Sequence, residues 1–292
     1  MAIGLYLWGY KTFTMSPLIE IDELRSATDH PIIIDARPGA DAYQRYLAGH
    51  LEGAQYADLD KDLALLPEDA AYGGRHPLPP LEDFAKLLGK WGITPESHII
   101  VYDDKAAAFG GARLWWMLRA IGHKNVQVLN GGLKAAIDAG IALSTETHAA
   151  QPVQPYPVPA KYSGTVDIQE TGEAAKDNKK MVIDVRETPR YLGQTEPIDL
   201  IAGHIPGAVN SPYTLNLDEK GKYKSPEELK SSYKKLLGSV EPGEVIVHCG
   251  SGVTACHTIL AMDYAGIAGP KLYVGSWSEW SRRDLPIATE KD

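Results

Sequence analysis

The 292-residue chain contains only two cysteines, Cys249 and Cys256, and they lie close together. Such a pair makes a poor disulfide framework, so we expect a reducing, cytoplasmic location. The chain also lacks a Cys/His cluster with metal-ligand spacing, and no glycine-rich nucleotide motif follows a strand pattern. We therefore expect no metal and no cofactor.

Long hydrophobic runs and blocks of basic residues are missing as well. No apolar run approaches the roughly 20 residues needed to span a bilayer. The formal net charge is −9, which argues against nucleic acid or an anionic membrane as the main partner. Residues 1–15 are apolar, but they have no basic start and no small-residue cleavage site. We interpret them as an N-terminal extension and not as a secretory signal.

The sequence repeats itself. Four short motifs occur twice, in the same order and with similar spacing. The matching segments are 31–37 with 181–186, 49–54 with 203–208, 99–103 with 245–249, and 126–131 with 271–275. This pattern indicates a duplicated domain of roughly 130 residues. Residues 151–163 are rich in proline, which favours an extended linker. We therefore predict one domain over 16–150 and a second over 164–292.

Short β-branched runs alternate with helical patterns in both halves. Residues 99–102 fit a buried strand, while 81–91 and 111–121 have the apolar spacing of helices. Residues 226–237 begin as a helix with Ser225 as the N-cap. This alternation predicts an α/β fold, in which each half is a mostly parallel sheet covered by helices on both faces. Active sites in such folds lie beyond the C-terminal ends of the strands.

The most informative segment is 245–255, in which a β-branched run ends at Cys249 and a loop with two glycines leads into a helical pattern. A free thiol has a pKa near ~8.5 and is mostly protonated at neutral pH. Backbone N–H groups of residues 250–254, with the helix dipole behind them, would stabilise a thiolate or a persulfide, Cys–S–S⁻. Gly250 and Gly252 allow a tight loop. Cys249 is therefore the candidate nucleophile.

Several motifs resemble those of the tandem-domain rhodaneses, the family of thiosulfate and 3-mercaptopyruvate sulfurtransferases. They are the two Asp-x-Arg strands, the turn Gly-His-Ile-Pro-Gly-Ala, the loop Cys-Gly-Ser-Gly-Val-Thr and the closing Gly-Ser-Trp-Ser-Glu-Trp. The resemblance runs from residue 16 to the C-terminus and implies two rhodanese-like domains, the first of which has lost its cysteine. Asp103, at the repeat position of Cys249, agrees with this.

The resemblance also implies an activity. A persulfide forms on Cys249, and its sulfur passes to a thiol such as thioredoxin or glutathione, or to cyanide. Two alternatives are weaker. Cysteine-dependent phosphatases need an arginine at the end of the loop, where this chain has Ala255. A non-catalytic binding module would not need the cysteine that the second half retains.

The sulfur donor is less clear than the chemistry. Thiosulfate enzymes of the family usually carry cationic residues where this loop has Gly250 and Ser251, so the neutral loop favours 3-mercaptopyruvate. The family pattern implies that Arg190 binds the anionic donor. Mercaptopyruvate enzymes usually have another arginine nine residues later, where this chain has Asp199. Thiosulfate therefore stays the alternative donor.

Further site residues follow from the resemblance. The hydroxyls of Ser251 and Thr254 are candidates to hydrogen-bond the reacting sulfur, although loop capping is the alternative. The candidates for binding substrate are Gly250, Gly252, Val253, Arg75, His76 and Arg186. For Arg186, the repeat counterpart Arg37 instead predicts pairing with a structural carboxylate.

The segment 73–79 resembles one that reaches across to the active site in relatives. It brings Arg75 toward an anion and suggests a proton relay of His76, Asp60 and Ser251. The alternative is that this His-Pro pair is structural. For Cys256 and for the tryptophans, core packing is the simpler interpretation. The tryptophans concerned are Trp115, Trp116, Trp277 and Trp280.

Overall fold

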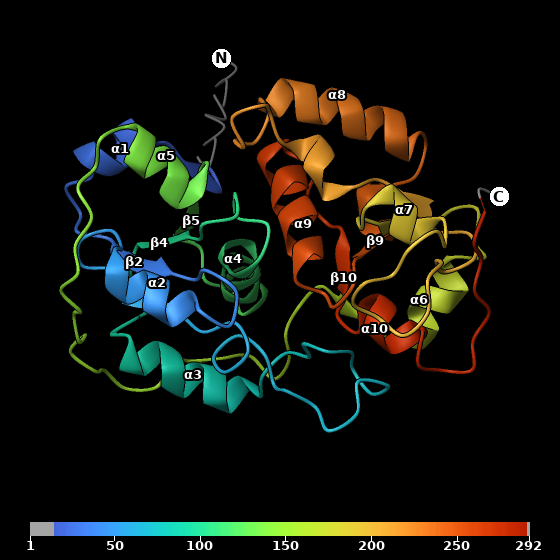
Figure 1. The fold of residues 1–292 in the computed structure, drawn as a ribbon, viewed down its shortest axis with the longest axis horizontal. Helices are drawn as coiled ribbons and strands as arrows, with labels where there is room; N and C mark the ends of the chain where they lie inside the picture. Colours follow the sequence, from blue (N-terminus) through green and yellow to red (C-terminus); the bar gives the residue numbers. More distant parts are fainter. Residues whose placement is uncertain (1–14, 291–292) are drawn as a thin grey trace, which may run out of the picture.

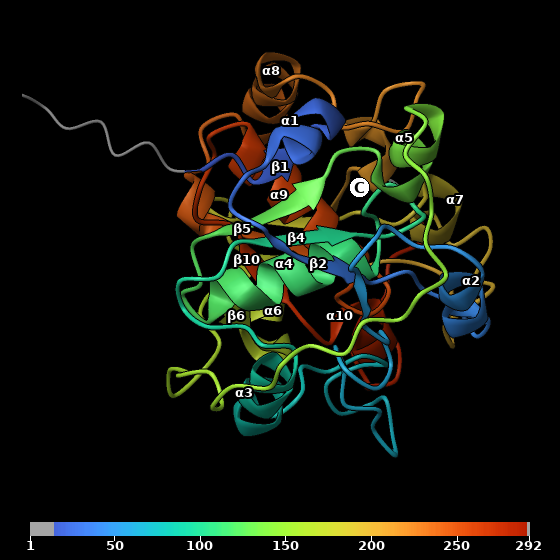
Figure 2. The same ribbon diagram turned by 90° about the vertical axis from the view of Figure 1, so that its left-hand side faces the viewer.

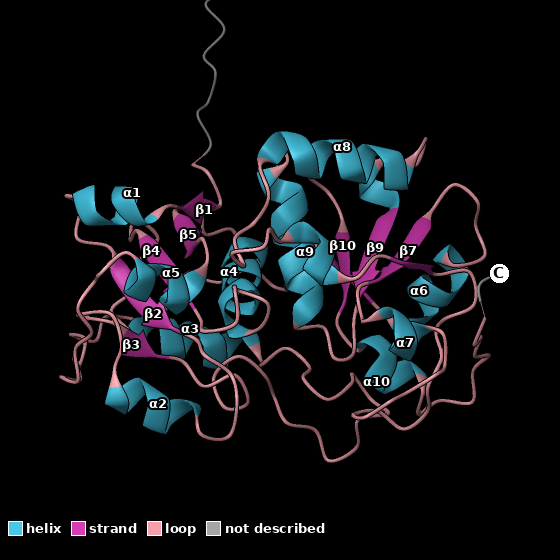
Figure 3. Cartoon of the chain, turned by 45° about the horizontal axis from the view of Figure 1, so that its top comes forward, coloured by secondary structure: helices cyan, strands magenta, loops and turns pink. Residues whose placement is uncertain are grey.

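The structure is a computed structural model that describes residues 15–290. These residues form two parallel sheets of five strands, one in each half of the chain (Figure 1, Figure 3). The strand order is β1-β5-β4-β2-β3 in the first half and β6-β10-β9-β7-β8 in the second. Each strand of the second sheet occupies the place of the strand five numbers earlier. The two halves therefore share one topology, as the repeated motifs predict.

The elements of the first half are bounded as follows. The strands are β1 (Leu18–Ile19), β2 (Ile32–Asp35), β3 (Gln55–Tyr56), β4 (Ile99–Tyr102) and β5 (Val126–Leu129). The helices are α1 (Ile21–Ser26), α2 (Ala42–Ala48), α3 (Leu81–Lys90), α4 (Gly110–Ala120) and α5 (Gly132–Asp138). The predicted strand over 99–102 is confirmed, and α3 and α4 confirm the two predicted helices to within a residue at each end.

The second half repeats this plan with small additions. Its strands are β6 (Thr165–Val166), β7 (Met181–Asp184), β8 (Val209–Asn210), β9 (Val245–His248) and β10 (Lys271–Tyr273). Its α-helices are α6 (Ile168–Ala174), α7 (Thr188–Tyr191), α8 (Pro226–Leu237), α9 (Thr254–Tyr264) and α10 (Ser276–Trp280). Two short 3₁₀ helices are η1 (Tyr213–Asn216) and η2 (Pro242–Glu244). Helix α8 begins as predicted, because Ser225 and Glu228 form a reciprocal capping box.

Apolar side chains cover both faces of each sheet. In β4, Ile99 and Val101 enter one core cluster, while Ile100 and Tyr102 enter another on the opposite face. This alternation follows from the two-residue period of a strand. Figure 2 shows helices α1 and α5 above the first sheet and α3 and α4 below it. The predicted α/β class, with helices on both faces, is confirmed.

Helices α4 and α9 join the two halves. They lie side by side at the centre of the molecule (Figure 1), and one continuous hydrophobic core includes residues of both. Residues 151–163 contain no helix or strand. Their first part runs along α3, where the N–H of Tyr156 donates to the carbonyl of Ala85 at 3.0 Å. All four tryptophans expected in the core are at most 4% exposed. Within residues 15–290, no helix is long and apolar enough to cross a membrane.

Candidate active site

A buried Asp-x-Arg pair stabilises the loop after the same strand in each half. In the second half, Arg186 binds the Asp184 carboxylate through Nε at 3.0 Å and the Gly203 carbonyl through Nη2 at 2.6 Å. In the first half, Arg37 makes the same contacts with Asp35 and with the carbonyl of Gly49. This agreement explains why both motifs occur twice.

The same contacts decide between the two predictions made for Arg186. Its guanidinium also binds Glu196 at 3.2 Å and lies over the Trp277 ring, and the side chain is 1% exposed. Although Arg186 lines the cavity described below, its donors are engaged within the protein. The structure therefore favours the structural pairing over donor binding.

Cys249 lies directly after β9, at the C-terminal edge of the second sheet. Its carbonyl accepts the N–H of Trp277 at 3.0 Å, and its own N–H donates to the Ser276 hydroxyl at 3.2 Å. Ser276 has a φ of 53°, in the left-handed region that non-glycine residues rarely adopt. Its repeat counterpart Gly132 has a φ of 58°. The chain thus keeps this conformation in both halves, and in the second half its side chain supports the cysteine.

The catalytic loop, residues 250–253, connects Cys249 to α9. Gly252 has a φ of +72°, and a Cβ there would lie 2.4 Å from the carbonyl oxygen of Val274, so only glycine fits. Gly250 has no positive φ; its missing side chain makes room for the Arg75 guanidinium, which would lie 3.0 Å from a Cβ. The predicted conformational role is therefore right for Gly252 and wrong for Gly250, where the close approach is the reason.

The equivalent loop of the first half binds a negatively charged group, the carboxylate of Asp103. The carboxylate of Asp103 is fully buried and accepts hydrogen bonds from four backbone N–H groups. The donors are Lys105 and Ala107 at 2.8 Å, Gly111 at 3.1 Å and Phe109 at 3.3 Å. In the catalytic loop, by contrast, the backbone N–H groups of 250–253 donate to no protein acceptor within residues 15–290. They are available for a negative charge on the sulfur of Cys249.

Cys249 lines a cavity of about 430 Å³ between the two halves, called the Cys249 cavity below. The predicted residues that line it are Arg75, His76, Arg186, Arg190, Gly250, Ser251, Val253 and Thr254. Asp60 and Gly252 do not line it. Asp60 reaches the site through His76, and the Gly252 carbonyl points to the first half, where it accepts a hydrogen bond from Arg113 at 3.0 Å. Gly252 thus shapes the loop, and its predicted contact with substrate stays a prediction.

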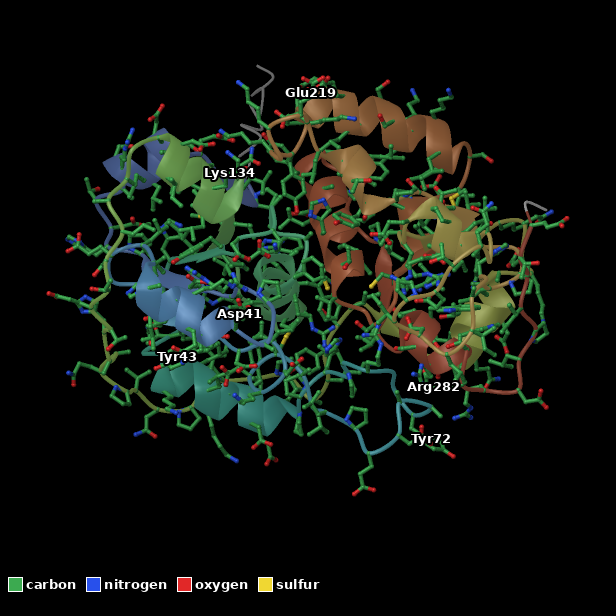
Figure 4. All side chains as sticks on the ribbon, viewed as in Figure 1. Asp41, Tyr43, Tyr72, Lys134, Glu219 and Arg282 are labelled. Atoms are coloured by element: carbon green, nitrogen blue, oxygen red, sulfur yellow. The ribbon has the colours of Figure 1, made fainter. Side chains whose placement is uncertain are left out.

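The loop of the first half that carries Arg75 and His76 is fixed against α10. In Figure 4 the part of it that carries Tyr72 passes close to this helix. The N–H of Arg75 donates to the Ser278 hydroxyl at 3.0 Å. Gly74 has a φ of +80°, and a Cβ there would lie 2.3 Å from the Gly275 carbonyl, so glycine is required for this close approach. These contacts fix the position of the first half relative to the second at the candidate active site.

His76, Asp60 and Ser251 meet, as the relay requires. Nδ1 of His76 lies 2.7 Å from the Ser251 hydroxyl, and Nε2 lies 3.1 Å from a carboxylate oxygen of Asp60. Burial, and next the positive charge of Arg75, lower the pKa of His76 below its usual 6.5. The imidazole is therefore neutral at neutral pH and can accept a proton.

Arg75 and Arg190, the two arginines predicted to bind the donor, are held by carboxylates. Arg190 binds Glu196 at 2.7 Å and Asp199 at 3.1 Å, and Arg75 binds Asp199 at 2.9 Å. The Asp199 side chain is fully buried. Arg75 does reach the site from the first half, as predicted. Arg75 and Asp199 are 124 residues apart, so no local sequence pattern predicts their ion pair. The only sign in the sequence was the aspartate at position 199, where relatives usually have an arginine.

Arg113 is a further residue of the site that the sequence did not predict. This fully buried residue of α4 donates to the carbonyls of Gly252, His76 and Leu63 at 3.0, 2.9 and 3.3 Å. Within residues 15–290 it forms no ion pair with a carboxylate. Burial lowers the pKa of Arg113 below its usual value. A charged residue inside the apolar pattern of 111–121 was the signal available in the sequence.

The comparison with known proteins now identifies the family. A model of the rhodanese-like domain matches residues 20–139 and again residues 167–283. The chain belongs to the rhodanese family. It is 39% identical to a probable 3-mercaptopyruvate sulfurtransferase of Pseudomonas aeruginosa, over 87% of this chain and 88% of that protein. It is 36% identical to a thiosulfate sulfurtransferase of Bos taurus, over 85% and 83%. The predicted family is confirmed.

Solved structures agree. The structure of a 3-mercaptopyruvate sulfurtransferase from Leishmania major matches with a TM-score of 0.78 and 31% identity, over 91% of this chain and 75% of that one. Two rhodanese domains, of which the second retains the cysteine, therefore account for the duplicated sheets and for Asp103 at the place of Cys249.

Proposed function

We propose that this rhodanese is a sulfurtransferase that takes a sulfur atom from 3-mercaptopyruvate and holds it as a persulfide on Cys249. The observation that carries the proposal is the position of the Cys249 thiol, which lies on the shared cavity, beside four free backbone N–H groups and before the N-terminus of α9. Cys249 is only 3% exposed, but it lines the cavity, so a thiolate there is stabilised and can be reached by a small anionic donor that enters the cavity.

The reaction balances as follows. The Cys249 thiolate attacks the thiol sulfur of mercaptopyruvate, an S–S bond forms, and the C–S bond breaks. The electron pair of the C–S bond passes to the carbon and leaves pyruvate enolate. The proton of the donor thiol moves to that carbon and gives pyruvate, with the persulfide left as Cys–S–S⁻. We assign the proton transfer to Ser251 and His76, and the 2.7 Å contact between them supports this.

Two observations support mercaptopyruvate as the donor. The loop carries neutral Gly250 and Ser251, where thiosulfate enzymes of the family usually have cationic residues. The Ser251 hydroxyl is engaged with a neutral imidazole and adds no positive charge for a dianion. Relatives named 3-mercaptopyruvate sulfurtransferase reach 39% identity.

Thiosulfate is the second candidate donor, and it would form the same persulfide. It is supported by the 36% identity to the bovine thiosulfate sulfurtransferase and by Asp199, which stands where mercaptopyruvate enzymes usually have an arginine. The acceptor we propose is a thiol such as thioredoxin or glutathione, or cyanide. Both cysteines are free thiols, which fits the proposed reducing, cytoplasmic location.

The test is intact-mass measurement after incubation with each donor. We expect the mass of one added sulfur atom in the wild type and in Cys256→Ser, and no addition in Cys249→Ser. Absence of the added sulfur with both donors would refute the proposal and favour a non-catalytic binding module. Steady-state rates with each donor, for the wild type and Arg190→Ala, identify the donor. Equal use of thiosulfate would overturn the preference for mercaptopyruvate.

A further inference from the structure

The arginines of the Cys249 cavity are already paired with carboxylates. Arg75 binds Asp199, and Arg190 binds both Asp199 and Glu196. Arg186 binds Asp184. The network also includes Arg282, which lies 3.5 Å from Asp199, and Glu187, which lies 3.8 Å from Arg190, while Glu196 binds Arg186 as well. Four guanidinium groups thus face four carboxylates. An anionic donor that enters this cavity therefore finds little net positive charge on the guanidinium groups.

Lys105 is different. It lines the same cavity as Cys249 and Arg190, but it comes from the first half. Within residues 15–290 its ammonium group forms no ion pair and no hydrogen bond with another side chain. The neighbouring Asp104, which would be its nearest potential partner in sequence, is instead bound by Arg45. Lys105 is thus a cation of the cavity that has no carboxylate partner among the described residues.

The backbone holds Lys105 at a defined place. Its N–H donates to the buried Asp103 carboxylate at 2.8 Å, as part of the loop that replaces the catalytic loop in the first half. In the repeat, Asp103 corresponds to Cys249, and Lys105 corresponds to Ser251. The loop that lost the nucleophile therefore still faces the cavity, and it presents a positive charge there while its Asp103 carboxylate fixes the backbone.

We propose that Lys105 binds the anionic end of the sulfur donor, so that the half without the nucleophile takes part directly in donor recognition. The inference rests on the proposed function for its choice of ligand, a small α-keto carboxylate with a terminal thiol. A lysine ammonium suits this role, because it is a mobile point charge that can follow a carboxylate without bidentate geometry. Its side chain is exposed, so replacing it leaves the core intact.

The first test is the KM for mercaptopyruvate, measured with 2-mercaptoethanol, a neutral acceptor, at saturation. We expect Lys105→Met to raise this KM about fivefold, the upper range for one exposed ion pair, with kcat nearly unchanged. Lys105→Glu should raise it further, and Lys105→Arg should stay near the wild type. Added salt should raise the KM of the wild type more than that of Lys105→Met. Lys124→Met, which removes an exposed lysine of the first half outside the cavity, is the matched control and should leave KM unchanged.

A second test reads binding without turnover. Pyruvate, which carries the same α-keto carboxylate, should slow the alkylation of Cys249 by iodoacetamide in the wild type. Lys105→Met should need several times more pyruvate for the same protection. If donors turn over but Lys105→Met and Lys105→Glu change neither KM nor protection, the inference is overturned and the proposed function stands. If neither donor transfers sulfur but protection still depends on Lys105, the proposed function fails, and what stands is that Lys105 binds an α-keto carboxylate in this cavity.

Discussion

The imidazole of His76 and the hydroxyl of Ser251 meet across the boundary between the two halves, with 2.7 Å between Nδ1 and Oγ. One belongs to the half without the nucleophile and the other to the catalytic loop. The first half is therefore part of the active site and not only a scaffold. It also contributes Arg75 and Lys105 to the Cys249 cavity.

Replacing His76 tests the proton relay. We expect His76→Gln to lower kcat with mercaptopyruvate by about 100-fold, the lower end for a positioned acid–base group. Ser251→Ala should lose a similar amount, and the double variant should lose little more, because residues that act as a unit are not additive. Steady-state kinetics of the three variants measure this. If the two losses multiply in the double variant, the residues do not act together.

The pH dependence provides a second check on the relay. Because the pKa of His76 is lowered from 6.5, mainly by burial, its imidazole becomes protonated only below that pH. The acid limb of kcat/KM should therefore lie below pH 6.5 in the wild type and disappear in His76→Gln. Asp60→Asn, which removes the exposed carboxylate bound to Nε2, should have a smaller effect on kcat. An acid limb that persists unchanged in His76→Gln would assign it to another group.

We expect Arg113 to hold the catalytic loop and the His76 loop in place, because it binds a carbonyl of each. Arg113→Met leaves three carbonyls, two of them in buried hydrogen bonds, without their donor, and we expect a loss of about 3 kcal/mol in the free energy of unfolding. Because two of these carbonyls belong to His76 and Gly252, kcat should fall as well, with little change in KM. Denaturant unfolding and steady-state kinetics measure the two effects.

A matched control separates the effect of Arg113 on the position of the catalytic groups from its effect on stability. Met117→Ala removes a fully buried side chain of the same helix, which forms no hydrogen bond with the loop, and should cost about 2–5 kcal/mol. At a temperature at which both variants are folded, Met117→Ala should retain kcat and Arg113→Met should not. Equal kcat in the two variants would show that Arg113 contributes to stability and does not position the catalytic groups.

Local sequence patterns predicted those parts of the fold that depend on interactions between residues close in sequence. The buried strand directly before Cys249, the glycine required at position 252 and the capping box at Ser225 each depend on neighbours in sequence. The repeat added the topology, because a duplicated pattern implies a duplicated sheet. The resemblance added Arg75 and the relay, which the structure brings together at the Cys249 cavity.

The electrostatics of the cavity could not be predicted in the same way. Whether an arginine is free for substrate depends on which carboxylates fold against it, and Asp199 reaches Arg75 over 124 residues of sequence. Lys105 was overlooked for a related reason, since nothing near it in sequence shows that its loop faces Cys249. The local prediction for Gly250 was wrong because its neighbour is a guanidinium from the other half.

The two thiols should differ in reactivity. Cys256 is fully buried in α9, and burial raises its pKa to about 12. It should therefore stay unmodified by iodoacetamide in the folded protein at neutral pH. Peptide mass spectrometry should find a single alkylated site, Cys249, until denaturant is added. Cys256→Ala should retain sulfur transfer. Rapid alkylation of Cys256 in the folded protein would contradict its burial.

Buried imidazoles should make the fold sensitive to acid, with His257 as the clearest case. Its Nδ1 lies 2.6 Å from the Tyr223 hydroxyl, and its Nε2 is buried with no partner within residues 15–290. Burial lowers the pKa of His257 from 6.5 to about 3. Between these values the unfolded chain binds a proton that the folded chain does not. Stability is therefore present above pH 6.5 and is lost as the pH falls, by up to about 1.4 kcal/mol per pH unit from this group.

The measurement is the free energy of unfolding from pH 7 to pH 4. We expect His257→Gln to be less stable at pH 7, because it loses the contact with Tyr223, but to show a shallower loss of stability on acidification. His148→Gln, which replaces an exposed imidazole, is the control and should keep the slope of the wild type. His76, His123 and His248 also have lowered pKa values, chiefly through burial, so part of the slope should remain in His257→Gln. A variant whose slope equals that of the wild type would show that His257 is already protonated in the folded chain at mildly acidic pH.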